Sequence, residues 1–195
     1  MTLNNYRTSL ICSSGGSTWP GAISAAGSGL NVLNASGAAL TLSGGITGVP
    51  GFTGSVLIRG TSNGTISGVI DLGPDGNVAK TDTGTWTIGN GGNTWKNTGV
   101  FLGTLTIGSN DTLPLTTALT MGQNDSGNAT FDLNGFNQTV GSLALSSTGG
   151  TKQITNSVAV ARSLTVDNIS AVRERSPRVI CDNSQSRCSR GLDNR

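Results

Sequence analysis

The side chains that could do chemistry in this chain are seven aspartates spread over residues 1–170. They are Asp71, Asp75, Asp82, Asp111, Asp125, Asp132 and Asp167. Cleavage of a sugar polymer needs clustered carboxylates, because one group transfers a proton while another attacks or stabilises the reacting carbon. No two of these aspartates are closer than four positions in the sequence. The spacing therefore favours solubilising turn residues, although a fold that stacks distant segments could bring two aspartates together.

Other catalytic and metal-binding chemistries are restricted by composition. The chain has no histidine, which excludes histidine-based triads and histidine metal sites. Two turns rich in Asp and Asn, Gly73–Asn77 and Gly122–Asn128, offer oxygen ligands of the kind that calcium prefers. They do not have the regular Gly-Gly-x-Gly-x-Asp spacing of calcium-binding repeats, so plain turns are the favoured interpretation. We expect no catalytic, cofactor-binding or metal-ligating residue and no cofactor.

The chain has three tryptophans, Trp19, Trp86 and Trp95. Exposed tryptophans can stack on sugar rings, which would make the chain a carbohydrate binder. We expect these side chains instead to fill or cover the corners of the fold.

The elements that must position these residues follow from the composition. Gly, Thr, Ser and Asn together account for 97 of the 195 residues, whereas charged residues are 11%. Thr favours strands, and Gly and Asn supply the conformations of tight turns. The hydrophobic content of 34% is spread along the chain and argues against simple disorder. The composition predicts many short strands separated by frequent turns.

A recurring triplet, in which Thr lies between two apolar residues, supports this prediction. It occurs at Leu40–Leu42, Trp86–Ile88, Leu105–Ile107, Leu119–Met121 and Leu164–Val166, with Phe131–Leu133 as a variant. In a strand, successive side chains point to opposite faces, so each triplet sends two apolar groups inward and one polar group outward. Self-similarity of this kind indicates a repeat architecture.

A β-solenoid of short stacked strands is the architecture that best fits these repeats. A hairpin sandwich needs a richer aromatic core than the 4% aromatic content here, and a membrane barrel needs longer strands with aromatic girdles. With roughly 20–25 residues per coil, residues 1–170 make about seven or eight coils. We expect aliphatic rows inside, ladders of Thr and Ser outside, and inward Asn stacked at bends.

Residues 80–108 carry a resemblance to a known family. The segment "KTDTGTWTIGNGGNTWKNTGVFLGTLTIG" is similar to the autotransporter-associated β-strand repeat. The matching positions are Lys80, Gly84, Thr85, Trp86, Thr87, Ile88, Asn93, Thr94, Gly103, Thr104 and Leu105, with Trp95 where the repeat has Tyr. Lys96, Asn97 and Thr98 depart from the usual Thr-Gly-Gly. Phe131–Ala144 resembles what commonly follows such a repeat, and Gly64–Gly73 resembles what commonly precedes one.

The resemblance implies a right-handed β-helix from the passenger region of an exported bacterial protein. We therefore expect an extracellular or cell-surface stalk segment, structural or adhesive, without catalysis of its own. Its expected partners are glycans or proteins on host or environmental surfaces, not nucleic acid, with flanking coils and an outer-membrane barrel in the full-length protein. The alternative is a fragment of a glycan-active β-helix enzyme, a polysaccharide lyase or hydrolase. No export signal is visible in the chain, so the location rests on the resemblance.

The domain boundaries follow changes in composition. We expect an irregular lead over residues 1–14, the solenoid over 15–170 with its best repeat unit at 80–108, and a disordered, Arg-rich tail over 171–195. The tail carries six Arg against Glu174, Asp182 and Asp193. Two interpretations of the tail stay open: the product of a reading-frame shift, or a genuine basic segment that binds an acidic partner.

Overall fold

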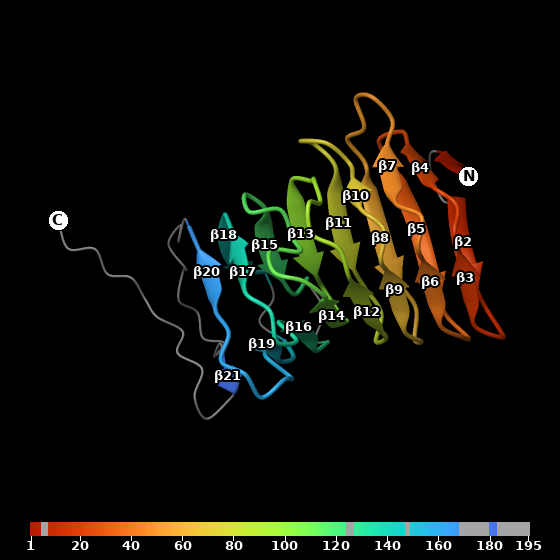
Figure 1. Ribbon diagram of the computed structural model, residues 1–195. Coiled ribbons are helices and arrows are strands. Elements are labelled where there is room, and N and C mark those ends of the chain that lie inside the picture. The colour runs from red at the N-terminus through yellow and green to blue at the C-terminus, as the bar shows by residue number, and fades with distance from the viewer. Residues whose placement is uncertain (5–7, 124–126, 147–148, 168–179, 183–195) are drawn as a thin grey trace.

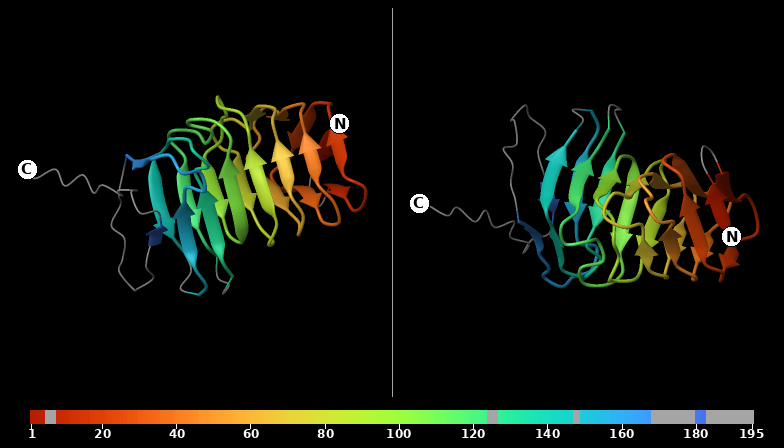
Figure 2. Two further views of the ribbon diagram at one scale, coloured as in Figure 1. Left: turned by 60° about the horizontal axis from the view of Figure 1, so that its bottom comes forward. Right: turned by 90° about the horizontal axis from the view of Figure 1, so that it is seen from above.

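The chain folds into a β-solenoid, as the sequence predicts (Figure 1). The computed structural model describes residues 1–4, 8–123, 127–146, 149–167 and 180–182. Every strand pair among them is parallel, and no helix occurs in these residues. The strands lie side by side along the long axis of the molecule, with the N-terminus at one end and β20 and β21 at the other (Figure 2).

Two large sheets run along most of the solenoid. The seven-stranded sheet consists of β2 (Thr8–Cys12), β5 (Leu30–Ala35), β8 (Ser55–Arg59), β11 (Asn77–Lys80), β13 (Asn97–Val100), β15 (Ala118–Met121) and β18 (Ser142–Leu145). The eight-stranded sheet consists of β3 (Ser17–Trp19), β6 (Leu40–Leu42), β9 (Gly64–Ile66), β12 (Thr85–Ile88), β14 (Gly103–Ile107), β16 (Ala129–Asp132), β19 (Lys152–Thr155) and β21 (Ile180–Asp182).

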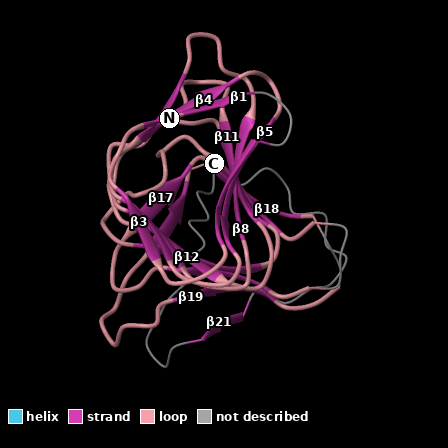
Figure 3. Cartoon of the chain, turned by 90° about the vertical axis from the view of Figure 1, so that its right-hand side faces the viewer, coloured by secondary structure: helices cyan, strands magenta, loops and turns pink. Residues whose placement is uncertain are grey.

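A third side of the solenoid is built from shorter pieces. The four-stranded sheet consists of β1 (Thr2–Asn4), β4 (Ile23–Ala26), β7 (Ile46–Gly48) and β10 (Ile70–Asp71). The two-stranded sheet consists of β17 (Gln138–Val140) and β20 (Leu164–Val166). Viewed along the long axis, the strands of successive coils overlie one another around a central core (Figure 3).

The register of the seven-stranded sheet gives the length of each coil. Val78 pairs with Thr98, 20 residues further along the chain, and Asn31 pairs with Val56, 25 residues further along. These are the limits of the coil length in this sheet, and its seven strands correspond to seven coils. Both values agree with the prediction from the sequence.

All five triplets predicted as strands lie in strands, but they do not mark a single side of the solenoid. Three of them, in β6, β12 and β14, belong to the eight-stranded sheet. The triplet in β15 belongs to the seven-stranded sheet and the one in β20 to the two-stranded sheet. The triplet therefore indicates a strand with one more deeply buried face, but it does not predict which sheet the strand joins.

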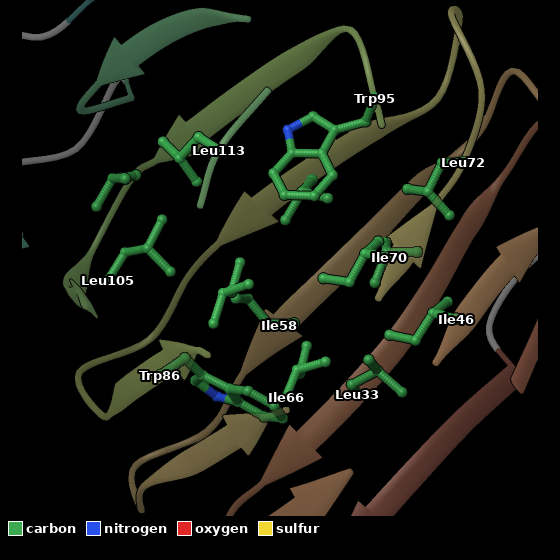
Figure 4. Packing of buried hydrophobic residues seen from close by; sticks show 14 of the residues in the cluster. Leu33, Ile46, Ile58, Ile66, Ile70, Leu72, Trp86, Trp95, Leu105 and Leu113 are labelled. Atoms are coloured by element: carbon green, nitrogen blue, oxygen red, sulfur yellow. The ribbon is translucent and has the colours of Figure 1, made fainter. Parts of the chain in front are cut away.

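The core is a column of aliphatic side chains with two tryptophans in it. Trp86 and Trp95 point into the same interior as Ile58, Ile66 and Ile70 (Figure 4). Trp86 is completely buried and Trp95 is 3% exposed. Burying apolar area in this way stabilises each coil only when it is stacked on its neighbours, because the interior of an isolated coil would be open to water above and below.

The ends of the chain differ in part from the expected boundaries. Residues 1–14, predicted as an irregular lead, contain β1 and β2, which pair with β4 and β5. Leu3 and Cys12 are buried there, so the solenoid includes this interval. In the predicted tail, Ile180–Asp182 forms β21, which pairs with β19. The other residues of 171–195 lie outside the described residues.

Candidate functional site

Five of the seven candidate aspartates join neighbouring coils through their carboxylates, and among the described residues no such contact involves Asp167. The Asp82 carboxylate accepts hydrogen bonds from Arg59 Nε at 3.0 Å and from the Gly60 amide at 3.1 Å. The other contacts of this kind are Asp71 with Thr94, Asp75 with Lys96, Asp111 with the Thr139 amide, and Asp132 with Ser157. Each joins residues 21 to 28 positions apart, which is one coil of the solenoid. Asp125 lies outside the described residues.

The carboxylates at the first turn considered for calcium contact neighbouring protein groups. In the first turn, Asp75 forms an ion pair with Lys96 at 3.6 Å, and the Gly73 amide donates to the Asp71 carboxylate at 3.3 Å. Part of the second turn, residues 124–126, lies outside the described residues. Elsewhere in the described ranges, no three His, Cys, Asp or Glu side chains lie close enough together to hold a metal ion.

The tryptophans fill the interior, as the favoured interpretation predicts for Trp86 and Trp95. Trp86 donates its indole N–H to the Arg59 carbonyl at 2.9 Å. Trp95 donates to Thr98 Oγ1 at 2.7 Å, and the Thr98 hydroxyl is in turn 2.9 Å from Thr117 Oγ1. Trp19 is half-buried, and its indole nitrogen has no hydrogen-bond partner. Stacking of Trp86 or Trp95 on a sugar ring would require the core to open.

A buried lysine is the most unusual charged group of the molecule. Lys80 is the last residue of β11, where the alternation of the strand places it on the inner face with Val78. Its side chain is 0% exposed. The Nζ atom donates to the carbonyls of Thr81 at 2.7 Å, Asp82 at 2.7 Å and Leu102 at 3.0 Å. An ammonium group has three donors, so this cage of three carbonyls satisfies it fully.

The cage lies at the corner between the seven-stranded and eight-stranded sheets and joins two coils. Burial lowers the pKa of Lys80 from its ordinary 10.5 to about 8, and the nearby Asp82 carboxylate opposes that shift. At neutral pH the amine therefore keeps its proton. Lys152 marks the same corner three coils later: it is 3% exposed and donates to the carbonyls of Gly127 and Gly149. Both lysines hold turns together, since their hydrogen bonds go to backbone carbonyls of the corner.

Two buried amides perform a similar task on the third side, where the strands are short. Asn93 accepts a hydrogen bond from the Ile70 amide at 2.7 Å and donates to the Thr112 carbonyl at 2.7 Å. Gln138 accepts from the Leu113 amide at 2.9 Å and donates to the Leu113 carbonyl at 3.0 Å. Each amide thus replaces a pair of backbone hydrogen bonds between coils. The inward Asn predicted at bends is present in Asn93.

Threonines form a continuous row on the outer surface of the eight-stranded sheet. Thr18 pairs with Thr41, Thr41 with Thr65, Thr65 with Thr87, and Thr87 with Thr106. A second row runs beside it, in which Thr85 pairs with Thr104 and Thr104 with Thr130. We call the outward residues of both rows, Thr18, Thr41, Thr65, Thr85, Thr87, Thr104 and Thr130, the threonine face. The predicted outer ladder of threonines is confirmed by this register.

The threonine face is accessible and uncharged. Thr18 is exposed, and its other members are half-buried between their neighbours. Thr106 continues the first row but is only 8% exposed, and the next residue in the row, Asp132, is bonded to Ser157. Among the described residues, the hydroxyl groups of the face have no hydrogen-bond partner in the protein. The face therefore offers a regular set of donors, acceptors and methyl groups to whatever lies outside it.

Known proteins do not place the chain in a family. No family model matches it, and neither a curated protein nor a solved structure does. Within the described residues, no helix is long and apolar enough to cross a membrane.

Proposed function

We propose that the chain is a structural and adhesive stalk segment of a larger exported bacterial protein, of the autotransporter passenger type, without catalysis of its own. The observation that carries the proposal is the threonine face, an outer surface that repeats from strand to strand of the eight-stranded sheet. Partners on this proposal are glycans or proteins on host or environmental surfaces, and the location is the cell surface.

The contacts between coils support a role in which the protein resists unfolding. Carboxylates, buried lysines and buried amides each connect one coil to the next, so the described polar side chains of the interior serve cohesion between coils. A stalk is loaded along its length and depends on the weakest interface between repeats. Hydrogen bonds with a charged donor or acceptor are among the stronger non-covalent contacts that side chains can make between coils.

The resemblance of residues 80–108 to the autotransporter repeat gains a physical rationale from the fold. Lys80, Trp86 and Asn93 occupy matching positions of that repeat and are all buried. Gly103, another matching position, has a φ of 72° and lies where a Cβ would be 2.8 Å from Lys80 Nζ. The matching positions thus include the lysine, its glycine neighbour and the amide, which are groups that join coils.

Surface display is tested with an antibody raised against the purified chain and applied to intact cells of the source organism. We expect labelling of intact cells that disappears after brief treatment with an external protease. Labelling that requires permeabilised cells would overturn the proposal of an exported stalk.

The competing enzymatic function is tested on the same purified chain. It is incubated with neutral and acidic polysaccharides, and new reducing ends are measured. We expect none above the level of heat-unfolded protein. Cleavage that is lost in Asp82→Asn would overturn the stalk proposal in favour of a glycan-active enzyme. Asp82 is the residue to test because its carboxylate lies beside the Arg59 guanidinium cation near the surface.

A further inference from the structure

The threonine face repeats in two directions at spacings that the backbone fixes. Neighbouring strands of a sheet are about 4.8 Å apart, which sets the distance between threonines along each row. Thr85 and Thr87 are two residues apart on one strand, which separates the two rows by roughly 6.6 Å. The two rows meet on β12, so the face consists of two offset rows of threonines, four along the first row and three along the second.

The threonines are also stiff. A β-branched side chain has few χ1 rotamers, and Thr41, Thr65 and Thr87 are each flanked by a threonine on both neighbouring strands. Ordering such side chains on binding costs little conformational entropy. A long polar side chain such as Lys or Gln would lose more on binding. This rigidity favours a partner that is itself ordered and repeating.

The chemistry of the face narrows the class of partner. The paired residues of its two rows carry no charge from β3 to β14, so the face has none of the basic groups that bind phosphate or acidic polymers. Of the aromatic residues of these strands, Trp86 and Phe131 point into the core, and Trp19 is half-buried at the end of β3. A protein interface usually needs aromatic or Arg anchors, and a sugar site usually needs an aromatic platform. The uncharged, evenly spaced rows favour a neutral, repeating partner that can donate and accept hydrogen bonds along them.

We propose that the threonine face binds ice. A Thr hydroxyl can donate one hydrogen bond to a lattice water and accept hydrogen bonds from two others, and the hydroxyls of the face have no partner in the described protein. Water held at each hydroxyl with the repeat of the strands forms a layer that continues into a crystal plane. Each contact is weak, and the binding comes from their number and spacing.

This inference assigns the threonine face to ice in place of the glycan or protein partners given above, and it rests on the proposed stalk only for the biological use of ice binding. Ice binding and surface display are measured in different experiments. Failure to bind ice with intact cell-surface labelling overturns the ice proposal alone. Failure of labelling with retained ice binding overturns the stalk alone.

The test is partitioning of the purified full chain into a slowly grown ice crystal, followed by measurement of crystal growth in a cooled droplet. We expect wild type to be enriched in the ice fraction and to slow or shape growth. Thr65→Tyr places a large ring in the middle of the first row, between Thr41 and Thr87, and is expected to lose most of this enrichment. The matched control is Thr120→Tyr, an outward, half-buried threonine on the seven-stranded sheet, which should partition like wild type.

Circular dichroism first confirms that both variants are folded. Where Thr65→Tyr is not folded, Thr65→Val keeps the shape and removes the hydroxyl, and it is expected to be less enriched in ice than wild type, whereas unchanged enrichment would count against a role of the hydroxyl. Exclusion of wild type from ice would overturn the proposal, and so would equal loss in Thr65→Tyr and Thr120→Tyr. Crystalline cellulose and chitin are tested in parallel. Retention on either of them without enrichment in ice would assign the face to a neutral polysaccharide instead.

Discussion

Gly64 and Trp86 form the pair whose replacement has the most clearly defined effect on the core. The two residues are direct partners in the register between β9 and β12. Gly64 does not have a positive φ, so the reason for glycine there is space. A Cβ at Gly64 would lie 2.2, 2.3 and 2.4 Å from three atoms of the Trp86 indole. The indole fills the volume that a side chain at residue 64 would otherwise take.

The cost of Gly64→Ala can be estimated from these distances. Ordinary carbon contacts are about 3.5–4.0 Å, so the ring would have to retreat by more than 1 Å. It has no exposed side to move toward, and it is held by its hydrogen bond to the Arg59 carbonyl. Overpacking of a dense core costs about 1–3 kcal/mol. We expect Gly64→Ala to lower the free energy of unfolding by about 3 kcal/mol, at the upper end of that range.

The sign of the effect should reverse when the indole is removed. Trp86→Leu alone leaves part of the indole volume empty and should cost about 3 kcal/mol. In that background the methyl group of Gly64→Ala enters empty space, where a buried methyl adds about 0.8 kcal/mol of stability. Replacing a strand glycine also removes a backbone entropy cost of about 0.5–1 kcal/mol. The double variant should therefore be more stable than Trp86→Leu by about 1 kcal/mol.

The assay is urea unfolding of the four proteins followed by far-ultraviolet circular dichroism, since tryptophan fluorescence changes with the substitution itself. Equal slopes with respect to urea show that the free energies are comparable. Gly89→Ala is the matched control, because its Cβ would meet nothing closer than 3.5 Å, and it should stay within about 0.5 kcal/mol of wild type. A similar cost for Gly64→Ala with and without the indole would refute the packing argument.

Three further predictions concern the polar groups of the interior. Lys80→Met leaves three carbonyls without a donor and should cost about 3 kcal/mol near neutral pH, measured by urea unfolding. Because burial lowers the pKa of Lys80 to about 8, the unfolded chain binds more protons than the folded chain above that pH. The free energy of unfolding of wild type should therefore rise from about pH 8 toward 10.5, and that of Lys80→Met should not show this rise. Gln138→Leu should cost about 2 kcal/mol because the Leu113 amide and carbonyl lose their partner, whereas the outward Gln153→Leu should change the melting temperature little; equal losses would contradict the bridging role. Thr98→Val should cost about 2 kcal/mol by leaving the Trp95 indole N–H without an acceptor, and an unchanged urea midpoint would argue that the indole finds another one.

The strands and the length of the coils could be predicted from the sequence because both depend on local patterns. Alternation within Leu40–Leu42 or Trp86–Ile88 shows which residues are buried. The same alternation also contains the signal for Lys80, because Val78 and Lys80 share a face of their strand. A fully buried lysine is uncommon, so the sequence alone favours an exposed Lys80 side chain. Only the structure shows the three backbone carbonyls that allow this side chain to be buried.

The contacts of the aspartates could not be predicted, since they depend on which coil lies above which. Coil lengths in the seven-stranded sheet vary from 20 to 25 residues, so a partner such as Arg59 for Asp82 cannot be counted from a fixed period. The two strands of residues 1–14 were missed for a related reason: β1 and β2 do not contain the triplet. Their burial comes from pairing with β4 and β5.

The inner and outer rows of the eight-stranded sheet follow different rules although they alternate on the same strands. Along the inner row, Leu40, Gly64, Trp86 and Leu105 are successive partners whose volumes compensate one another. Along the outer row, Thr18, Thr41, Thr65 and Thr87 keep one residue type. Packing requires only that the total inner volume be filled, so the residues there can differ. No packing requirement of this kind acts on the outer row, and its uniformity therefore supports a surface role in which the repeat itself is what the partner contacts.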